Sequence, residues 1–302
     1  MSLFNTLMAS AIPLVPRALI RKVSRRYIAG ETAAEALVRV RALDAQGFSA
    51  TLDVLGESVS SLSQADRTTD EYLRVLDAIG HHGLHANISI KPTALGLLLD
   101  EAHCENNFRR LLAAAERHGI FVRIDMEDAS VTQKEIDLLA RLKRDHDRVG
   151  IVLQAYLKRT YDDIEPLLGE RENLRLCKGI YVEGREHLVD QAWRDRRAIN
   201  AHFLNHAARC FDSATFVGLA THDEELIGQL IDLARRKGID KGRFEFQMLL
   251  GVCENLQGRL LGMGYAVRIY VPYGRDWYGY SMRRIKENPQ IAGYLMKAAL
   301  GR

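Results

Sequence analysis

Short apolar runs rich in β-branched residues alternate along the chain with longer segments of helical periodicity. We expect strands over residues 49–54, 85–90, 121–125, 149–154, 174–178, 215–220, 244–248 and 266–271. Their regular spacing is typical of strand–turn–helix units. Most of the runs are nearly continuous in apolar residues, as in strands covered on both faces. Eight such units predict an α/β fold, a (β/α)8 barrel of the TIM type, with extra helices at its N-terminus.

A doubly wound parallel sheet is the alternative fold. It would usually carry a glycine fingerprint after its first strand, and none is present. Helix starts are indicated by Thr-x-x-Glu sequences, which have the spacing of capping boxes. They begin at Thr32, Thr68 and Thr132, and the first of these helices should stop at Gly47.

The first 45 residues differ in character from the rest. Residues 1–30 contain no acidic residue, and basic residues crowd between Arg17 and Arg26. A secretory signal places its charge before the apolar segment, and here the charge follows it. We expect residues 1–45 to form a helical segment packed on the barrel of residues 46–302, with Leu19, Val23 and Tyr27 on one helix face. A membrane-surface contact and a cleaved mitochondrial presequence are the alternatives.

Composition narrows the class of protein. Lys plus Arg exceed Asp plus Glu by only three charges, which gives no case for nucleic-acid binding. The four cysteines lie far apart and form no C-x-x-C pair, so a reducing compartment and a cytoplasmic location are expected. No apolar run approaches the length of a transmembrane helix.

Polar side chains stand at or just past the ends of the predicted strands. The carboxyl ends of parallel barrel strands open on one face, where active sites form. The sequence therefore places chemically capable groups together at one mouth. They are Lys91, Asp125, Gln154, Arg175, Lys178, Thr221, His222, Gln247 and Tyr270.

Near the C-terminus, Tyr280, Arg283, Arg284 and Glu287 have the spacing of one helix face, and Trp277 extends it. An ion-paired solvent face is one interpretation, because Arg283 and Glu287 are four residues apart. Two arginines flanked by aromatic residues favour an anion clamp, since the planar guanidinium binds a carboxylate through two parallel hydrogen bonds.

Lysines and acids at the mouth leave alternatives open. Lys91 precedes Pro92 and has three interpretations: a Schiff-base nucleophile, a cation for an anionic substrate, or a plain rim charge. The acidic stretch from Asp125 to Asp128 is suited to a cation, a general base or a helix start. The spacing of Arg175 and Lys178 would turn them to opposite faces of a regular strand.

A histidine pair is the remaining chemical motif. His202 and His206 have the i, i+4 spacing of a helical zinc pair, but no Glu follows His202, so we expect no metal. Sequences typical of a P-loop or a dinucleotide-binding loop are absent.

Taken in order, several blocks resemble proline dehydrogenase of the monofunctional bacterial type. They are Ser89-Ile-Lys91, Ile124-Asp125-Met-Glu, Gln154-Ala-Tyr-Leu-Lys158, Arg175-Leu-Cys-Lys178-Gly-Ile-Tyr181, Thr221-His222, Phe246-Gln247 and Tyr270-Val-Pro-Tyr-Gly274 with the clamp helix that follows. The resemblance runs from about residue 30 to residue 290. It implies a distorted barrel that holds FAD non-covalently and oxidises L-proline to Δ1-pyrroline-5-carboxylate, with hydride transfer to the flavin and a quinone as the final acceptor.

The resemblance also implies roles residue by residue. Asp125 and Arg175 match active-site positions. Lys91, Arg283 and Arg284 match cations for the substrate carboxylate, Tyr270 and Tyr280 match the pocket walls, Glu287 matches the acid that holds Arg283, and Gln247 matches a supporting position. The implied flavin contacts are Met126, Gln154, Lys178, Gly179, Ile180, Thr221 and His222.

One residue departs from the family pattern. Ile180 stands where alanine is expected, so the resemblance does not define the preference between proline and its analogues. A Schiff-base aldolase using Lys91 or Lys178 is the alternative enzyme. A membrane-docking module with a basic N-terminal helix is the non-catalytic alternative. Peripheral contact with the inner face of the cell membrane is compatible with the enzyme, because quinones dissolve in lipid.

Overall fold

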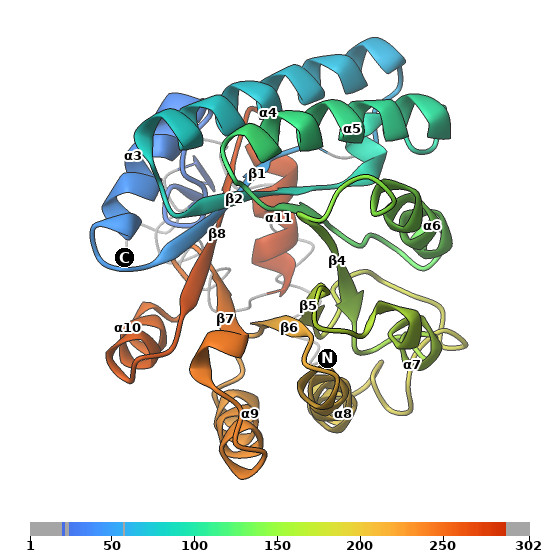
Figure 1. Ribbon diagram of the computed structural model, residues 1–302, viewed down its shortest axis with the longest axis vertical. Helices are drawn as coiled ribbons and strands as arrows, with labels where there is room; N and C mark the ends of the chain where they lie inside the picture. The colour runs from blue at the N-terminus through green and yellow to red at the C-terminus, as the bar shows by residue number, and fades with distance from the viewer. Residues whose placement is uncertain (1–19, 22–23, 57, 288–302) are drawn as a thin grey trace.

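Eight parallel strands close into a barrel in the part of the chain that the computed structural model describes, residues 20–21, 24–56 and 58–287 (Figure 1). For residues 283–287 this description covers the backbone and not the side chains. Each strand pairs with the next, and β1 pairs with β8 to complete the ring. The strands are β1 (Ser49–Val54), β2 (Ala86–Ile90), β3 (Val122–Ile124), β4 (Val149–Gln154), β5 (Asn173–Cys177), β6 (Phe216–Ala220), β7 (Phe244–Leu249) and β8 (Val267–Tyr273).

The barrel confirms the predicted α/β fold, and all eight predicted strands form. The bounds of β1 and β4 are those expected, and the others differ by one or two residues at an end. β3 is the shortest strand and ends at Ile124, so Asp125 follows the strand instead of closing it. The Asp125 amide still donates to the Ile90 carbonyl, which keeps this residue in line with β2.

An outer ring of helices covers the strands (Figure 1). Their apolar faces pack on the barrel, as for helices that cover a parallel sheet. They are α3 (Ala33–Asp44), α4 (Leu62–His82), α5 (Glu101–Arg117), α6 (Thr132–Leu142), α7 (Thr160–Asp163), α8 (Ile199–Asp212), α9 (Glu224–Arg236) and α10 (Glu254–Gly262). A further helix, α11 (Trp277–Glu287), follows β8 and is not part of this ring.

Helix starts follow the capping pattern at one of the three predicted places. Thr32 and Glu35 form a complete capping box at the start of α3, which ends at Asp44, three residues before Gly47. The prediction at Thr68 is wrong, because α4 begins six residues earlier, at Leu62. Within α4 the Thr69 hydroxyl donates to the Ala65 carbonyl in the preceding turn, a bond that threonine forms in the interior of a helix.

The third Thr-x-x-Glu sequence has a different use. α6 does begin at Thr132, but its N-cap is Val131 and no side chain caps it. The Glu135 carboxyl group instead accepts from the backbone amide of Glu127, at 3.1 Å. The acid of this sequence therefore holds the loop that follows β3, and it does not close a capping box.

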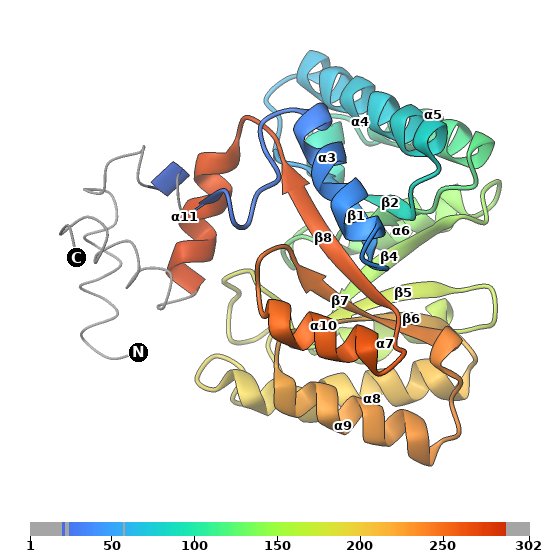
Figure 2. The same ribbon diagram turned by 90° about the vertical axis from the view of Figure 1, so that its left-hand side faces the viewer.

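α11 lies across the C-terminal mouth of the barrel. It is seen through the ring of strands in Figure 1 and beyond the end of β8 in Figure 2, beside the described residues near the N-terminus. Ile28 and Leu55 pack with Tyr280, and the hydroxyls of Ser24 and Ser281 are 2.7 Å apart. The described part of the N-terminal segment therefore contacts α11, and the predicted helix face is tested only at half-buried Tyr27, because Leu19 and Val23 lie outside the described residues.

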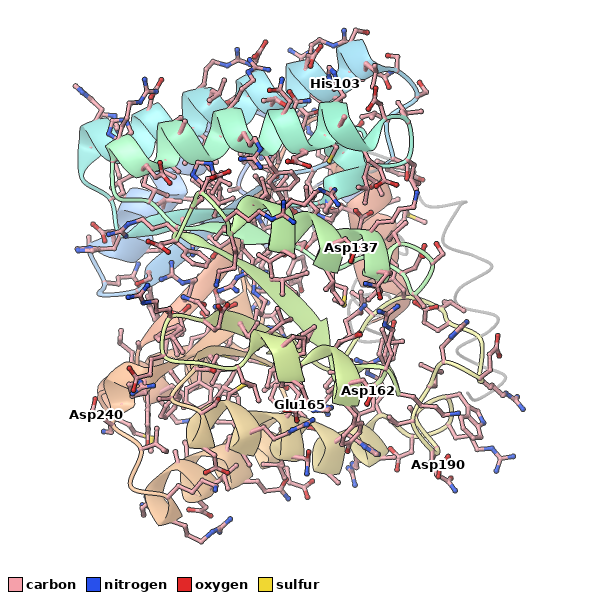
Figure 3. All side chains as sticks on the ribbon, turned by 45° about the vertical axis from the view of Figure 1, so that its right-hand side comes forward. His103, Asp137, Asp162, Glu165, Asp190 and Asp240 are labelled. Atoms are coloured by element: carbon pink, nitrogen blue, oxygen red, sulfur yellow. The ribbon has the colours of Figure 1, made fainter. Side chains whose placement is uncertain are left out.

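The apolar core lies between the strands and the helices, whereas charged side chains cover the outer helix faces. Figure 3 labels examples on this outer surface, such as Asp137 on α6 and Asp162 on α7. None of the helices in the described residues is long and apolar enough to cross a membrane.

Candidate active site

Arg175 lies at the centre of a buried polar cluster inside the mouth of the barrel. It projects from β5 and is 5% exposed. Its Nη1 donates to Asp125 Oδ1 at 2.7 Å and to Ser89 Oγ at 3.0 Å, and its Nε donates to Gln247 Oε1. One guanidinium thus binds residues from β2, β7 and the segment after β3. These elements face one another across the interior because the sheet closes into a barrel.

Asp125 is held as a carboxylate. It accepts from the Ser89 hydroxyl and from the Tyr270 hydroxyl, the latter at 2.7 Å. Burial acts to raise the pKa of Asp125, but the charges of Arg175 and Lys91 and these hydrogen bonds outweigh it and lower the pKa below its ordinary value. Burial and the negative charge of Asp125 raise the pKa of Tyr270, so the phenol keeps its proton.

Lys91 is paired with a carboxylate that the sequence analysis did not select. Both oxygens of Asp53, which is 1% exposed, lie 3.2 Å from Lys91 Nζ. Burial acts to lower the pKa of Lys91, but the charges of Asp53 and Asp125 outweigh it and raise the pKa. The ammonium is therefore charged.

The charged form of Asp53 is disfavoured by its surroundings. Burial raises its pKa, with a smaller contribution from Asp125, while the Lys91 charge acts in the opposite direction. The Tyr72 hydroxyl lies 3.4 Å from Asp53 Oδ1 and donates to the Ser89 carbonyl at 2.8 Å. Tyr72 thus joins β1 to β2 through the same aspartate that pairs with Lys91.

The loop after β3 is fixed by two buried glutamates. The Glu127 carboxylate accepts from the amide of Thr93 at 3.0 Å and from the Thr93 hydroxyl, two residues after Lys91. The Glu127 carbonyl accepts from Gln154 Nε2 at 2.7 Å. Glu127 therefore ties together the segments that carry Lys91 and Gln154, and a helix-start role does not explain it. Burial and the Glu127 charge raise the pKa of Glu135 to about 9, so Glu135 is protonated at neutral pH. Met126 is buried in this loop.

A second group of predicted residues surrounds Asp223, the N-cap of α9. Lys178 Nζ lies 2.6 Å from Asp223 Oδ2, and the Asp223 amide donates to Thr221 Oγ1 at 3.1 Å. Burial acts to raise the pKa of Asp223, but the hydrogen bond and charge of Lys178, together with the hydrogen bonds from the Leu226 amide and Asn200, outweigh it and lower the pKa. Arg175 and Lys178 have different partners, and Lys178 follows the end of β5, so the alternation of a regular strand does not apply to it.

Gly179 turns the chain immediately after Lys178. Its φ of +107° lies in a region that side chains rarely adopt, and a Cβ atom there would lie 2.2 Å from the Tyr156 ring. The Gly179 carbonyl accepts from Arg196 at 2.8 Å. The next residue, Ile180, is 42% exposed, so its side chain is available at the surface of the mouth.

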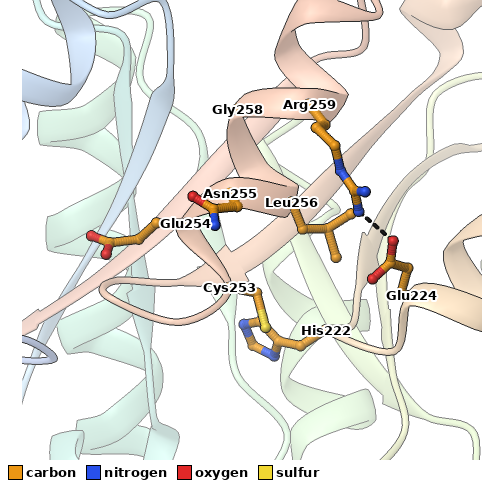
Figure 4. A pocket seen from close by; sticks show the side chains of 8 residues that line it. All are labelled: His222, Glu224, Cys253, Glu254, Asn255, Leu256, Gly258 and Arg259. Carbon is orange, nitrogen blue, oxygen red and sulfur yellow. Dashed lines mark hydrogen bonds and ion pairs between the residues drawn. The ribbon is translucent and has the colours of Figure 1, made fainter.

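His222 opens on a pocket of about 760 Å³ between the segment after β6 and the start of α10 (Figure 4). Its Nε2 accepts from the Leu249 amide at 2.8 Å, so the neutral ring carries its proton on Nδ1. Cys253 and Glu254 line the same pocket, and Arg259 pairs with Glu224 at its edge.

The predicted clamp residues lie on one helix. Tyr280 is 8% exposed and packs with Leu55 and Trp277. Arg283, Arg284 and Glu287 belong to α11, but their side chains lie outside the described residues, so their predicted roles stay predictions.

The histidine pair is a packing feature. His202 Nδ1 bonds with the Tyr161 hydroxyl at 2.8 Å, whereas His206 is buried against the Tyr161 ring with neither ring nitrogen hydrogen-bonded to a described residue. Over the described residues, no group of three His, Cys, Asp or Glu side chains is arranged to hold a metal ion.

Sequence reasoning missed Asp53, Tyr72 and Ser89 as members of the cluster. A signal for Asp53 was present, because in residues 49–54 the polar side chains Thr51 and Asp53 alternate with Ala50 and Leu52. Strand side chains alternate between faces, so this pattern directs Asp53 into the barrel. Ser89 belonged to a quoted block without a role, and nothing in the sequence joined Tyr72 to β1 and β2.

A closed (β/α)8 barrel with a buried charged cluster at the carboxyl ends of its strands has the architecture of a TIM-barrel enzyme. The model of the proline dehydrogenase family matches residues 36–297. The chain is 36% identical to proline dehydrogenase 1 of Bacillus subtilis over 277 residues, which cover 92% of this chain and 90% of that protein. It is 33% identical to proline dehydrogenase of Deinococcus radiodurans, with the same shares covered.

Solved structures agree on the fold. Proline utilization A from Bdellovibrio bacteriovorus, inactivated by N-propargylglycine, superposes with a TM-score of 0.80 at 23% identity, over 89% of this chain and 33% of that one. The chain therefore belongs to the proline dehydrogenase family. It is a monofunctional member, an oxidoreductase of proline metabolism.

Proposed function

We propose that the enzyme binds FAD non-covalently, oxidises L-proline to Δ1-pyrroline-5-carboxylate, and passes the electrons to a quinone. Family membership supports the substrate. The observation that carries the cofactor assignment is the Nη2 atom of Arg175, which is buried at the barrel mouth with no hydrogen-bond partner among the described residues. Buried polar atoms in folded proteins are nearly always paired, so a donor at the mouth suits an acceptor on a bound group.

Further features fit a flavin. The Asn200 Oδ1 atom is likewise buried without a partner, although Asn200 Nδ2 lies 3.3 Å from Asp223. Unpaired donor and acceptor atoms suit a large, flat, heteroatom-rich ring with a phosphate-containing tail.

The residues that would hold the cofactor are those carried over from the family resemblance. Bound FAD supplies a two-electron acceptor for a hydride from the proline ring. Arg175 provides positive charge where the reduced ring gains negative charge, an electrostatic role that needs its fixed position. The flavin contacts are Met126, Gln154, Lys178, Gly179, Ile180, Thr221 and His222.

Lys91, Arg283 and Arg284 would grip the carboxylate of proline. Glu287 would hold Arg283, and Tyr270 and Tyr280 would form walls against the ring. Orientation of the substrate over the acceptor is most of what the protein must supply.

Asp125 acts in this scheme as a fixed anion, since its lowered pKa makes it a poor proton acceptor. It orients the Arg175 guanidinium through Oδ1 and the Tyr270 hydroxyl through Oδ2. Gln247 supports Arg175 from the other side.

The Schiff-base aldolase is disfavoured by the state of its lysines. A Schiff-base nucleophile must be neutral, whereas the pKa of Lys91 is raised by Asp53 and Asp125 and Lys178 is ion-paired with Asp223. The carboxylates instead suit a lysine that serves as a cation.

We place the enzyme in the cytoplasm, with peripheral contact at the inner face of the cell membrane, because its quinone partner dissolves in lipid. The basic residues of the N-terminal segment support this location. Sedimentation with anionic vesicles should fall after removal of residues 1–30, and unchanged sedimentation would reject that role for the segment.

The visible absorption spectrum tests the function. Purified protein should show flavin bands that bleach on adding L-proline without oxygen and return on adding a soluble quinone. D-proline is the matched control, since it differs from L-proline only in the configuration of the carbon that carries the carboxylate. Protein that remains colourless and inert after incubation with FAD would overturn the proposal.

A further inference from the structure

We propose that Glu245 is a positioning residue, which fixes the orientation of the Gln247 amide and through it the direction of the Arg175 guanidinium. The inference rests on the proposed flavin function and adds the means by which the barrel interior aims Arg175. Glu245 and Arg268 belong to no motif that the sequence analysis selected.

The contacts form a continuous chain along the inside of the barrel. Arg268 on β8 donates from Nε to Glu245 Oε1 at 2.6 Å, and its Nη1 donates to the Ala50 carbonyl at 2.8 Å. Glu245 Oε1 also accepts from Gln247 Nε2 at 2.7 Å. Gln247 Oε1 then accepts from Arg175 Nε.

The chemistry of the two neighbours leaves the Gln247 amide one orientation. A guanidinium only donates hydrogen bonds and a carboxylate only accepts them. The amide must therefore turn its oxygen toward Arg175 and its nitrogen toward Glu245. Without an acceptor at position 245, the buried amide nitrogen loses its partner, and the Gln247 side chain is no longer anchored beside Arg175 Nε.

Gly218 provides the room for this arrangement. A Cβ atom at this position of β6 would lie 2.2 Å from Gln247 Nε2. The Gly218 φ angle is one that other residues adopt, so the constraint is the missing side chain and not the backbone. The Gln247 amide thus occupies the space that a side chain at position 218 of β6 would fill.

The orientation of Gln247 determines the orientation of the Arg175 guanidinium. Its Nη1 is held by Asp125 and Ser89, and its Nε by Gln247. Three bonds on two sides of a planar group fix the plane of the guanidinium and hence the direction of the unpaired Nη2. Loss of the Nε bond would let the plane tilt and weaken the interaction with negative charge on a reduced flavin.

The test replaces the ion pair as a unit, E245M/R268M, since removal of one partner alone leaves a buried charge that destabilises the fold. The double replacement keeps the net charge unchanged. Tilting of Arg175 predicts about a tenfold lower ratio of reduced to oxidised flavin against a reference dye, which is about 30 mV for a two-electron couple. The matched control replaces the exposed pair Asp232 and Arg235 on α9 by methionine and should leave the potential unchanged.

A double-mutant cycle separates positioning from general disturbance. Q247M removes the acceptor for Arg175 Nε and should lower the potential by itself. In a Q247M background the E245M/R268M replacement should cause no further change, because its effect passes through Gln247. Equal effects in both backgrounds would overturn the proposal.

A second, charge-free variant keeps the proposal testable if the pair replacement fails to fold. G218A inserts one methyl group against the Gln247 amide, whereas G228A inserts one into open space on α9. The Arg175 Nε–H signal in ¹H–¹⁵N spectra of the purified protein, identified by its loss in R175K, should shift in G218A and not in G228A. An unmoved signal and an unmoved potential would reject the inference.

Failure of the proposed function has a different appearance. Wild-type protein would then carry no flavin, and no potential could be measured, although the Arg175 Nε–H signal would still respond to G218A. A yellow, proline-reducible wild type with unchanged variants would reject the positioning role alone.

Discussion

His206 should make the fold sensitive to mild acid. The side chain is buried on α8, packs 4.5 Å from the Tyr161 ring centre, and has no hydrogen-bonding partner for either ring nitrogen among the described residues. Burial, with a smaller contribution from His202, lowers its pKa from 6.5 to about 4. Below pH 6.5 the His206 side chain therefore binds a proton in the unfolded chain but not in the folded protein. Stability is lost as the pH falls from 6.5 toward 4.

The size of the effect follows from that shift. Each pKa unit corresponds to about 1.4 kcal/mol of differential interaction. Between pH 7 and pH 5 the unfolded histidine becomes almost fully protonated while the folded one stays neutral, so the free energy of unfolding should fall by about 2 kcal/mol from this group. His206→Leu removes the titration and also a buried donor without a partner, which costs about 1–3 kcal/mol.

Urea unfolding at pH 7 and pH 5 measures both quantities. His206→Leu should unfold at a higher urea concentration than the wild type at pH 7, and its advantage should widen by about 2 kcal/mol at pH 5. His81→Leu is the matched control, because His81 is exposed near the end of α4. Equal losses of stability on acidification in wild type and His206→Leu would refute the reasoning.

Other predictions concern the site. Asp53→Asn removes a charge that raises the pKa of Lys91, so the loss of kcat/KM for proline on the alkaline side should begin at lower pH than in wild type; identical pH profiles would contradict this. Gly179→Ala places a methyl group against Tyr156 in a strained backbone costing about 1–3 kcal/mol, so less FAD should remain bound after dialysis than in Gly228→Ala. Arg284→Lys should raise KM about tenfold with little change in kcat, since one planar fork is lost, and an unchanged KM would reject the clamp.

The strands were predictable because a barrel strand covered on both faces needs β-branched apolar residues in a short run. That requirement is local, so the run from Val149 to Gln154 marks its own ends. Helix starts are less local. The Thr68 sequence has the spacing of a capping box, but the apolar stripe of α4 continues back to Ala65, and burial of that face extended the helix toward Ser61.

The membership of the polar cluster depends on which strands become neighbours. Sequence identified Arg175 and Asp125 separately, but the contact between them spans 50 residues and exists only in the register of the closed barrel. The polar positions of β7 and β8 carried a usable signal. Glu245 and Gln247, and likewise Arg268 and Tyr270, alternate with apolar residues, which directs them to the inner face.

That inner face differs from the branched apolar packing usual in such barrels. Its charged side chains are nearly all paired, which offsets much of the cost of burying them. Within the described residues, buried guanidinium nitrogens without a partner occur at Arg123 and Arg175. At Arg123 this nitrogen is Nε, and the outer nitrogens donate to Asn173 and the Ile151 carbonyl, so the side chain is anchored within the protein at the start of β5.

At Arg175 the unpaired nitrogen is Nη2, an outer nitrogen at the mouth of the barrel, while Nε and Nη1 are hydrogen-bonded. The barrel thus holds Nε and Nη1 of Arg175 and leaves the Nη2 donor for a ligand. Electrostatic assistance to a reduced cofactor requires such a fixed, partly unpaired cation.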